Sequence, residues 1–182
     1  MISLNVRSTQ EELLDQENIN AADLHQNLKE LDVINRMLGG HKATFVALNK
    51  IIGSSTDKVW RIIDIGCGGG DTLVAIYHWA KKRNINVELT GVDLLEEAIV
   101  YAKKESEGLG INFLASDFND LKSGDFDIAL SSLVCHHLYD KDLDNLLLTK
   151  MRMAKYGLIN DLHRHWFAYF GIWILTALFS KS

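Results

Sequence analysis

The sequence predicts an α/β fold in three layers, with a mostly parallel sheet between two layers of helices. Three observations support this prediction. An apolar run rich in β-branched residues, Val59–Ile65, ends in a glycine cluster and leads into the amphipathic segment Thr72–Arg83. Further short apolar runs alternate with helical patterns, which is typical of parallel sheets. Residues ahead of Val59 show only helical spacing, so we expect helices there.

Composition limits the classes of function. The 182 residues are 47% hydrophobic and 24% charged, as in an ordinary globular domain. The net charge is −5 and the longest basic run is Lys81-Lys82-Arg83, so we expect a small-molecule substrate and no nucleic-acid partner. Cys67 and Cys135 lie far apart without a C-x-x-C pair, which favours a reducing compartment. The polar N-terminus lacks a secretory apolar core, and we expect a cytoplasmic protein.

The N-terminal part reads as helices from Ser8 to about Ile52, and Gly39-Gly40 marks the boundary between two of them. We expect a helical cap over residues 1–53 and the main domain over residues 54–182. Polar residues around the boundary, Asn35-Arg36 and His41, could fold over a ligand. We favour a solvated helix end, because water easily satisfies a single cap.

The first βα turn carries Asp64, Gly66, Gly68 and Gly70. Glycines there allow positive φ angles and close approach of a ligand to the backbone. A phosphate-binding P-loop would need lysine after the last glycine, and a dinucleotide fingerprint would need glycine at 71, where Asp71 stands. The extra carboxylates predict a cationic or zwitterionic ligand.

This Asp64-x-Gly66-x-Gly68-x-Gly70 pattern resembles the first motif of class I S-adenosylmethionine (SAM)-dependent methyltransferases, which have a Rossmann-like fold. The resemblance implies SAM as the cofactor, with the loop backbone, Cys67 included, along its methionine and ribose parts. It also implies that Asp64 orients the SAM amino group. A glycine-rich turn without a ligand is the alternative.

The remaining elements follow in alternation. We expect strands at Val87–Asp93, Ile111–Ala115, Phe126–Leu133 and Tyr156–Leu162, and helices at Leu95–Glu107 and Asp140–Met153. The last of these helices carries Leu143, Leu146, Leu147 and Met151 on one face. Parallel strands present their carboxyl ends at one edge of the sheet, so residues that follow the strands should meet there.

Two acidic positions at strand ends match the cofactor. Asp93 can accept hydrogen bonds from both ribose hydroxyls, and Leu94 can line the adenine. Asp117-Phe118 resembles the family's adenine-contact pair, which offers an acceptor and a backbone donor. Asp117 could instead form its own Asx turn.

The segment Ser131–Leu138, with adjacent histidines, resembles the wall beside the methyl group in methyltransferases of the ubiquinone/menaquinone type. In that resemblance, backbone carbonyls near Ser131 and Ser132 hold the SAM amino group. Adjacent residues point in different directions, so at most one histidine should face the pocket, and we favour His137 over His136.

The fifth strand leads into Asn160-Asp161 and His163-Arg164-His165 at the expected pocket mouth. His163 and His165 lack further ligands at metal spacing, so we expect no metal. The apolar segment Trp166–Phe179 is too short for a membrane span and suits a buried or interfacial helix. Membrane contact should therefore be peripheral at most.

Together these features predict methyl transfer from SAM to a small apolar or aromatic acceptor, such as a polyketide, phenol, quinone precursor or lipid-like molecule. Transfer is an in-line displacement that depends mainly on alignment. His137 or His163, oriented by Asp161, could serve as a base. Two alternatives remain open: an inactive module that binds SAM or a nucleoside, and a dinucleotide-dependent oxidoreductase, which Asp71 disfavours.

The resemblance also implies a seven-stranded sheet whose last two strands form a hairpin beside the fifth. After Leu162 the sequence offers only the apolar segment Trp166–Phe179, so we expect the last two strands to be missing and the fifth strand to be an open edge. We expect either a C-terminally incomplete chain or a dimer through this edge or the aromatic segment.

Overall fold

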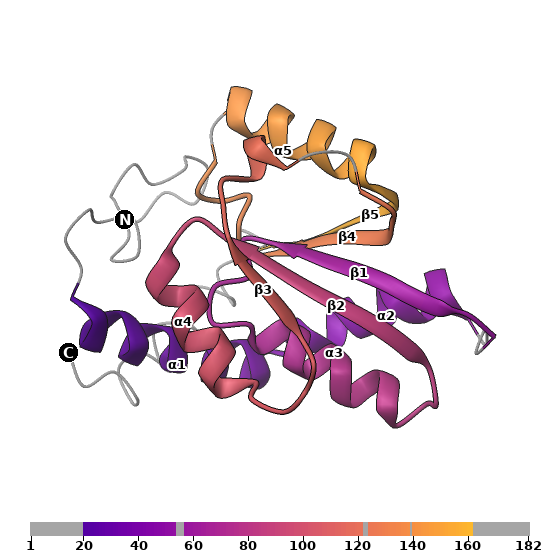
Figure 1. Cartoon of the computed structure of the whole chain (residues 1–182), viewed down its shortest axis with the longest axis horizontal. Helices are drawn as coiled ribbons and strands as arrows, with labels where there is room; N and C mark the ends of the chain where they lie inside the picture. Colours follow the sequence, from indigo (N-terminus) through magenta and orange to yellow (C-terminus); the bar gives the residue numbers. More distant parts are fainter. Residues whose placement is uncertain (1–19, 54–56, 122–123, 139, 162–182) are drawn as a thin grey trace, which may run out of the picture.

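The computed structural model describes residues 20–53, 57–121, 124–138 and 140–161 (Figure 1). Its elements, in chain order, are α1 (Ala21–Leu38), α2 (Gly40–Ile52), β1 (Val59–Ile65), α3 (Asp71–Lys81), β2 (Asn86–Asp93), α4 (Glu96–Glu105), β3 (Asn112–Ala115), the 3₁₀ helix η2 (Phe118–Asp120), β4 (Phe126–Ser132), α5 (Asp140–Met153) and β5 (Ala154–Asn160). The expected helix Trp166–Phe179 and residues 8–19 lie outside the described residues.

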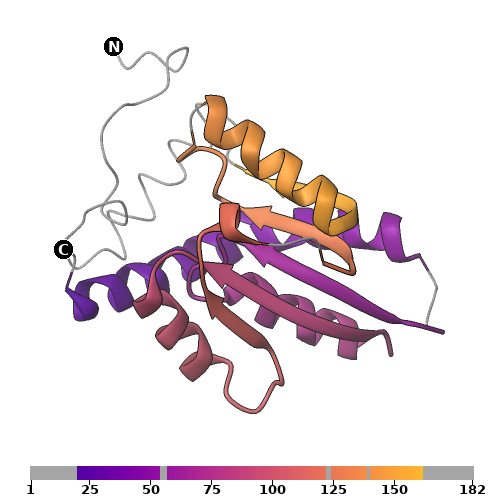
Figure 2. The same cartoon turned by 45° about the horizontal axis from the view of Figure 1, so that its top comes forward.

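The sheet has the strand order β3-β2-β1-β4-β5, and all neighbouring strands are parallel. Figures 1 and 2 show α5 on one face of the sheet and α2, α3 and α4 on the other. The predicted three-layer α/β fold with a parallel sheet is therefore confirmed. Chain order reverses between β1 and β4, and in such sheets ligands bind at the carboxyl ends of the strands beside the reversal.

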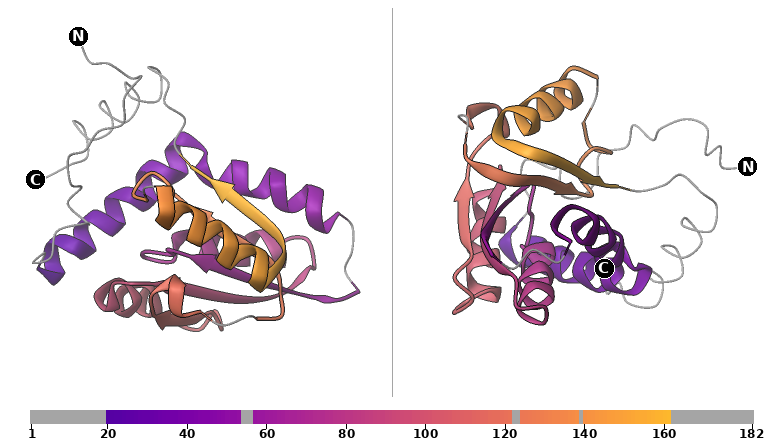
Figure 3. Two further views of the ribbon diagram at one scale, coloured as in Figure 1. Left: turned by 90° about the horizontal axis from the view of Figure 1, so that it is seen from above. Right: turned by 90° about the vertical axis from the view of Figure 1, so that its right-hand side faces the viewer.

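Local sequence explains where the first helices begin and end. The Asn20 side chain caps α1 by accepting a hydrogen bond from the backbone N–H of Asp23 at 2.9 Å. Gly39 ends α1 in the left-handed region, with φ of +78°, and α2 begins at the next residue. α1 and α2 therefore meet at an angle without an intervening loop (Figure 3).

The observed boundaries of the helices and strands agree closely with those predicted from the sequence. β1 and α5 begin and end at the expected residues, and β5 begins earlier than expected, at Ala154. Within the described residues β5 is an edge of the sheet, as expected for the fifth strand. No helix in this part of the chain combines the length and apolarity that a membrane crossing needs.

Core packing divides between the two faces of the sheet because successive β1 side chains alternate. On the α5 face, Ile63 and Ile65 pack with Leu146. On the other face, Ile62 joins a larger cluster that includes Leu48 of α2. α2 is thus part of the main core, while α1 packs on α4 through a smaller cluster.

The buried face of α5 differs from the expectation. Leu146 is fully buried, but Leu147 is exposed and Met151 is 78% exposed. The residues that α5 buries are Leu146, Thr149, Lys150 and Met153. The expected face was wrong because it counted only apolar residues, whereas Lys150 is buried with hydrogen-bond partners in the sheet.

We predict that Leu146→Ala lowers the free energy of unfolding by about 2–5 kcal/mol, because it leaves a cavity in a closed part of the core. Leu147→Ala on the same helix is the matched control, and its cost should stay below about 1 kcal/mol. Urea denaturation measures both. Equal costs would show that α5 packs on the sheet through the face that the sequence suggested.

Candidate cofactor site

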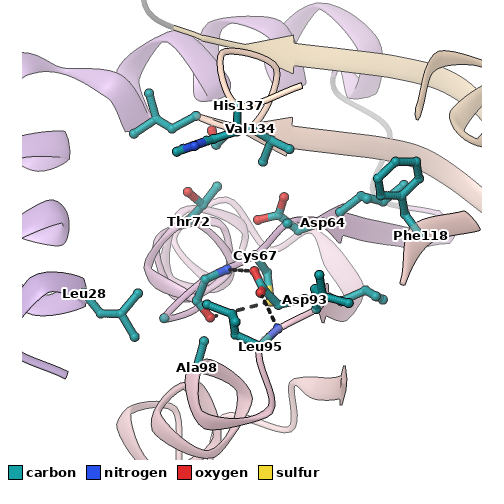
Figure 4. Close-up of a pocket in the computed structure, with 18 of the residues that line it drawn as sticks. Leu28, Asp64, Cys67, Thr72, Asp93, Leu95, Ala98, Phe118, Val134 and His137 are labelled. Atoms are coloured by element: carbon teal, nitrogen blue, oxygen red, sulfur yellow. Dashed lines mark hydrogen bonds between the residues drawn. The ribbon is translucent and has the colours of Figure 1, made fainter. Parts of the chain in front are cut away.

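The carboxyl ends of β1, β2 and β4 open into a cavity of about 730 Å³. Its walls come from α1, the glycine loop of residues 66–70, the ends of the strands and η2 (Figure 4). Sites for small ligands usually measure roughly 300–1,000 Å³. The cavity lies at the predicted edge of the sheet, beside the reversal of strand order.

Most of the predicted site residues meet at this cavity. Those that line it are Asp64, Gly66, Cys67, Gly68, Asp93, Leu94, Asp117, Phe118, Ser132 and His137. Gly70, Ser131 and Asp161 do not line it. His163 lies outside the described residues.

The glycine loop turns sharply after β1. Its Gly66 and Cys67 N–H groups donate to the Val92 carbonyl of β2 at 2.8 and 3.0 Å, which fixes the loop to the neighbouring strand. Gly66, Gly68 and Gly70 have φ of +76°, +49° and +76°, a region in which only glycine is unstrained. Their positive φ explains the spacing of the glycines.

At two of these glycines, the space that a Cβ would need is occupied by another side chain of the protein and not left for a ligand. A Cβ on Gly66 would lie 2.5 Å from Val134 Cγ2, and one on Gly70 would lie 2.9 Å from the Phe113 ring. At Gly68 the nearest atom is Leu28 Cδ2 at 3.6 Å. Of the three glycines, Gly68 therefore leaves the most room for a ligand beside its backbone.

Asp64 is a buried carboxylate at the end of the central strand, and it faces the cavity (Figure 4). Among the described residues its Oδ1 has no hydrogen-bond partner. Burial raises the pKa of Asp64 well above its ordinary value; Lys150 opposes this shift, while Asp71 and Asp93 add to it. A buried, unpaired carboxylate oxygen at a cavity fits a ligand that carries a hydrogen-bonding cation.

Asp93 and Asp117 present acceptors from the next two strands. Asp93 accepts hydrogen bonds from the Gly68 N–H at 2.7 Å and the Leu95 N–H at 3.0 Å, one on each oxygen. Each oxygen keeps a further lone pair for a ligand. Asp117 accepts from the Asn119 backbone at 2.8 Å, so it forms an Asx turn and also lines the cavity.

The two histidines after β4 point to different partners. His137 lines the cavity, whereas His136 Nδ1 lies 2.7 Å from Asp161 Oδ1. The two rings are 4.1 Å apart between centroids. Asp161 therefore contacts His136, the neighbour of the histidine that we expected it to orient. Sequence reasoning had assigned His136 no role beyond capping or packing.

The polar boundary between α1 and α2, here called the corner (residues 35–44), buries two polar side chains that we expected to be solvated, Asn35 and His41. Asn35 Nδ2 donates to Asp71 Oδ2 at 3.0 Å, and His41 Nε2 lies 2.9 Å from the same oxygen. Asn35 and His41 are only 7% and 9% exposed. The preference for a solvated helix end was wrong, because Asp71 supplies a charged acceptor that the local sequence of the corner does not reveal.

Lys150 is a buried residue that sequence reasoning missed. Its Nζ donates to Ser131 Oγ and to the Leu158 carbonyl, both at 2.8 Å. Ser131 therefore faces α5 and not the cavity. Burial lowers the pKa of Lys150 to about 8. The signal that could have found it is its spacing from Leu146, which places a cation on the buried face of the helix.

Among the described residues, one group of side chains has the spacing of metal ligands: Asp32, His41 and Asp71, with ligand atoms within 4.8 Å of one another. Its members already have hydrogen-bonding partners. Arg36 Nε pairs with Asp32 Oδ1 at 2.7 Å, and Asn35 and His41 share the Asp71 oxygen. Hydrogen bonds account for the arrangement without a metal ion.

Comparison with known proteins identifies related chains. The model of a family described as methyltransferase domain matches residues 56–152. The release factor glutamine methyltransferase of Haemophilus influenzae is 32% identical over 97 residues, which cover 50% of this chain and 32% of that protein. This chain thus spans less than half the length of the curated relatives it matches.

Solved structures show the same fold. Magnesium protoporphyrin IX methyltransferase from Synechocystis PCC 6803, solved with bound SAM, superposes with a TM-score of 0.56 at 13% identity, covering 77% of this chain and 74% of that one. The plantazolicin methyltransferase BpumL, solved with a triazolic desmethylPZN analog and S-adenosylhomocysteine (SAH), has a TM-score of 0.53 at 26% identity, covering 76% and 50%.

We predict that Asp64→Asn is more stable than the wild type at neutral pH, by on the order of 1 kcal/mol or more. The raised pKa means that the folded state favours the protonated form of Asp64. The stability that Asp64 contributes is therefore fully present below about pH 3.8, where both states are protonated, and is lost as the pH rises through the folded-state pKa. Denaturation at several pH values measures the difference. Asp93→Asn is the control and should destabilise, because the Asp93 carboxylate accepts two backbone N–H groups.

Lys150 generates a second pH prediction. Its pKa falls from 10.5 to about 8 on folding, so the charged form is disfavoured in the folded state. The stability of the wild type relative to Lys150→Met should therefore rise with pH between about 8 and 10.5, by up to about 3 kcal/mol. Parallel urea titrations give this difference. A constant difference across that interval would contradict the lowered pKa.

Proposed function

Since this chain belongs to the methyltransferase domain family, we propose that it binds SAM and transfers the cofactor's methyl group to a small apolar or aromatic acceptor. The observation that carries the proposal is the buried, unpaired Oδ1 of Asp64 at a cavity beside the glycine loop. This carboxylate suits the ammonium group of SAM. The finer assignment to the ubiquinone/menaquinone type stays a prediction.

The cavity residues fit the parts of SAM in sequence order. Asp64 would hold the amino group and the Gly68 backbone would lie along the methionine part. The two oxygens of Asp93 are held by backbone N–H groups, and their remaining lone pairs would accept the ribose hydroxyls. Leu94 and Phe118 line the cavity and would contact the adenine.

The acceptor side of the cavity is mainly apolar. Leu24, Leu28 and Leu31 of α1 line the cavity, and so do Val134 and Leu138 of the loop after β4. Such a wall favours an acceptor that buries carbon, because apolar surface removed from water stabilises binding. Asp71 and Asp93 both raise the pKa of Asp64, so negative charge is already concentrated here, and a neutral acceptor suits the site better than an anionic one.

When bound, SAM would supply an electrophilic methyl carbon to which an acceptor lone pair bonds while the carbon–sulfur bond breaks. The chain's own contribution is alignment of the two partners in one cavity. His137 lines that cavity and would take a proton from a hydroxyl acceptor. Asp161, which follows β5, holds the ring of His136, and the His137 ring lies against that ring. Asp161 would therefore orient His137 through His136.

Partners and location stay proposals as well. Cys67 and Cys135 are free thiols, which suits the reducing cytoplasm. The β5 edge exposes Ile159 at 47%, so a dimer through this edge is the partner that the sheet would accept. His163 as an alternative base also remains a prediction.

We predict that calorimetric titration detects binding of SAM and SAH but not of NAD. Asp93→Ala should weaken SAM binding by about 1.5–3 kcal/mol, because a charged acceptor of two hydroxyls is removed. Asp64→Asn should weaken SAM binding as well, although we expect this variant to be more stable. Equal affinity for NAD would favour the oxidoreductase alternative.

Release of SAH in the presence of neutral phenols separates an active enzyme from an inactive SAM-binding module. His137→Ala should lower the turnover with hydroxyl acceptors while SAM affinity changes little. If SAM binds but no acceptor of this class supports SAH release, the proposed acceptor is wrong and the binding-module alternative gains support.

A further inference from the structure

Asp71 has no part in the proposed transfer, yet its carboxylate contacts polar side chains of two other helices. It is the first residue of α3 and directly follows the glycine loop. Its Oδ2 accepts a hydrogen bond from Asn35 of α1 at 3.0 Å and lies 2.9 Å from His41 Nε2 of α2. Burial raises the pKa of Asp71, but the hydrogen bonds from His41 and Asn35 outweigh it and hold that pKa below its ordinary value. An ionised carboxylate thus joins two helices to the start of a third.

Gly40 shows how tightly the corner is built around this contact. A Cβ on Gly40 would lie 1.6 Å from Asn35 Oδ1 and 2.8 Å from Asn35 Cγ. The Asn35 side chain therefore lies across the position where any other residue would have its Cβ. Only glycine at position 40 lets Asn35 reach Asp71 in this conformation.

A second contact holds the corner from the opposite side. Asn160, the last residue of β5, places its Nδ2 3.0 Å from the Gly40 carbonyl and 3.1 Å from Thr44 Oγ1. The same nitrogen is 3.3 Å from Ser132 Oγ, and Ser132 lines the cavity. The corner is therefore fastened both to α3 and to the end of the sheet, and Figure 3 shows it beside the end of β5.

The corner decides where α1 lies. α1 carries Leu24, Leu28 and Leu31 on the cavity wall, with Asn35 at the same wall. Its other anchorage is a small cluster in which Leu24 and Leu28 pack on Ala98 of α4. His25 of α1 also lies 2.8 Å from Glu97 Oε1 of α4 and packs against the Tyr101 ring. Without the corner contacts, these contacts with α4 would have to hold α1, and the end of α1 nearest the corner would lose its fixed position on the cavity wall.

We propose that Asp71 is a positioning residue that fastens α1 over the cavity, so that SAM binding and docking of the corner stabilise each other. The inference rests on the proposed function for the identity of the ligand. SAM can contact the α1 wall only while the corner is attached to Asp71. Attachment therefore raises the affinity for SAM, and bound SAM favours attachment by the same factor.

Gly40→Ala tests the proposal, with Gly157→Ala on β5 as the matched control because no atom of the described residues lies within 4 Å of its added Cβ. Alanine favours a helix more than glycine does, so a loss at position 40 cannot come from a weakened α2. We expect Gly40→Ala to weaken SAM binding at least tenfold in calorimetry. Hydrogen exchange of residues 21–38 should become faster, while exchange of β1 and β2 stays unchanged. Gly157→Ala should bind SAM within twofold of the wild type.

Asn35→Ala is a second variant, which removes the donor to Asp71 without adding bulk, and it should act in the same direction. Bound SAM should slow exchange of residues 21–38 in the wild type and much less in either corner variant. Unchanged exchange in both variants, or faster exchange with unchanged SAM affinity, would overturn the proposal. If the wild type does not bind SAM, the proposed function fails; faster exchange of unliganded Gly40→Ala would then still support the fastening role of Asp71, and unchanged exchange would reject it.

Discussion

The cost of burying negative charge at the end of the central strand is the constraint on which the site depends. Three carboxylates, Asp64, Asp71 and Asp93, lie close enough that two of them raise the pKa of the third. The structure offsets each one differently. Asp93 accepts two backbone N–H groups, Asp71 accepts donors from the corner, and Asp64 has Lys150 as the nearby cation. Asp64 keeps a buried oxygen, Oδ1, without a hydrogen-bond partner among the described residues, and Asp64 lines the cavity.

The sequence was sufficient to predict those features that depend on neighbouring residues or on a pattern that repeats along the chain. The β-branched run that forms β1 and the glycines that follow it predicted a strand and its turn, and both are present at those residues. Asp93 and Asp117 could be placed beside the glycine loop because parallel strands bring their carboxyl ends to one edge. The methyltransferase resemblance, which combined these positions, is confirmed by the family match.

Contacts between distant segments could not be predicted. Asn35 and Asp71 are 36 positions apart, so nothing in the sequence around Asn35 reveals its charged acceptor. Lys150 was missed because the predicted face of its helix was chosen from apolar residues alone. The reason given for the glycines was also incomplete: Gly66 and Gly70 give space to Val134 and Phe113, which approach from elsewhere in the chain.

The contact between Asn160 and the Gly40 carbonyl joins residues 120 positions apart. Closing so long a loop costs chain entropy, which is recovered only after the intervening strands have paired. During synthesis, α1 and α2 leave the ribosome before β5, so the partner that completes their attachment arrives only with the end of β5. The nascent chain therefore carries the apolar wall of α1 uncovered until the sheet is assembled, and the binding-competent state is the last to form.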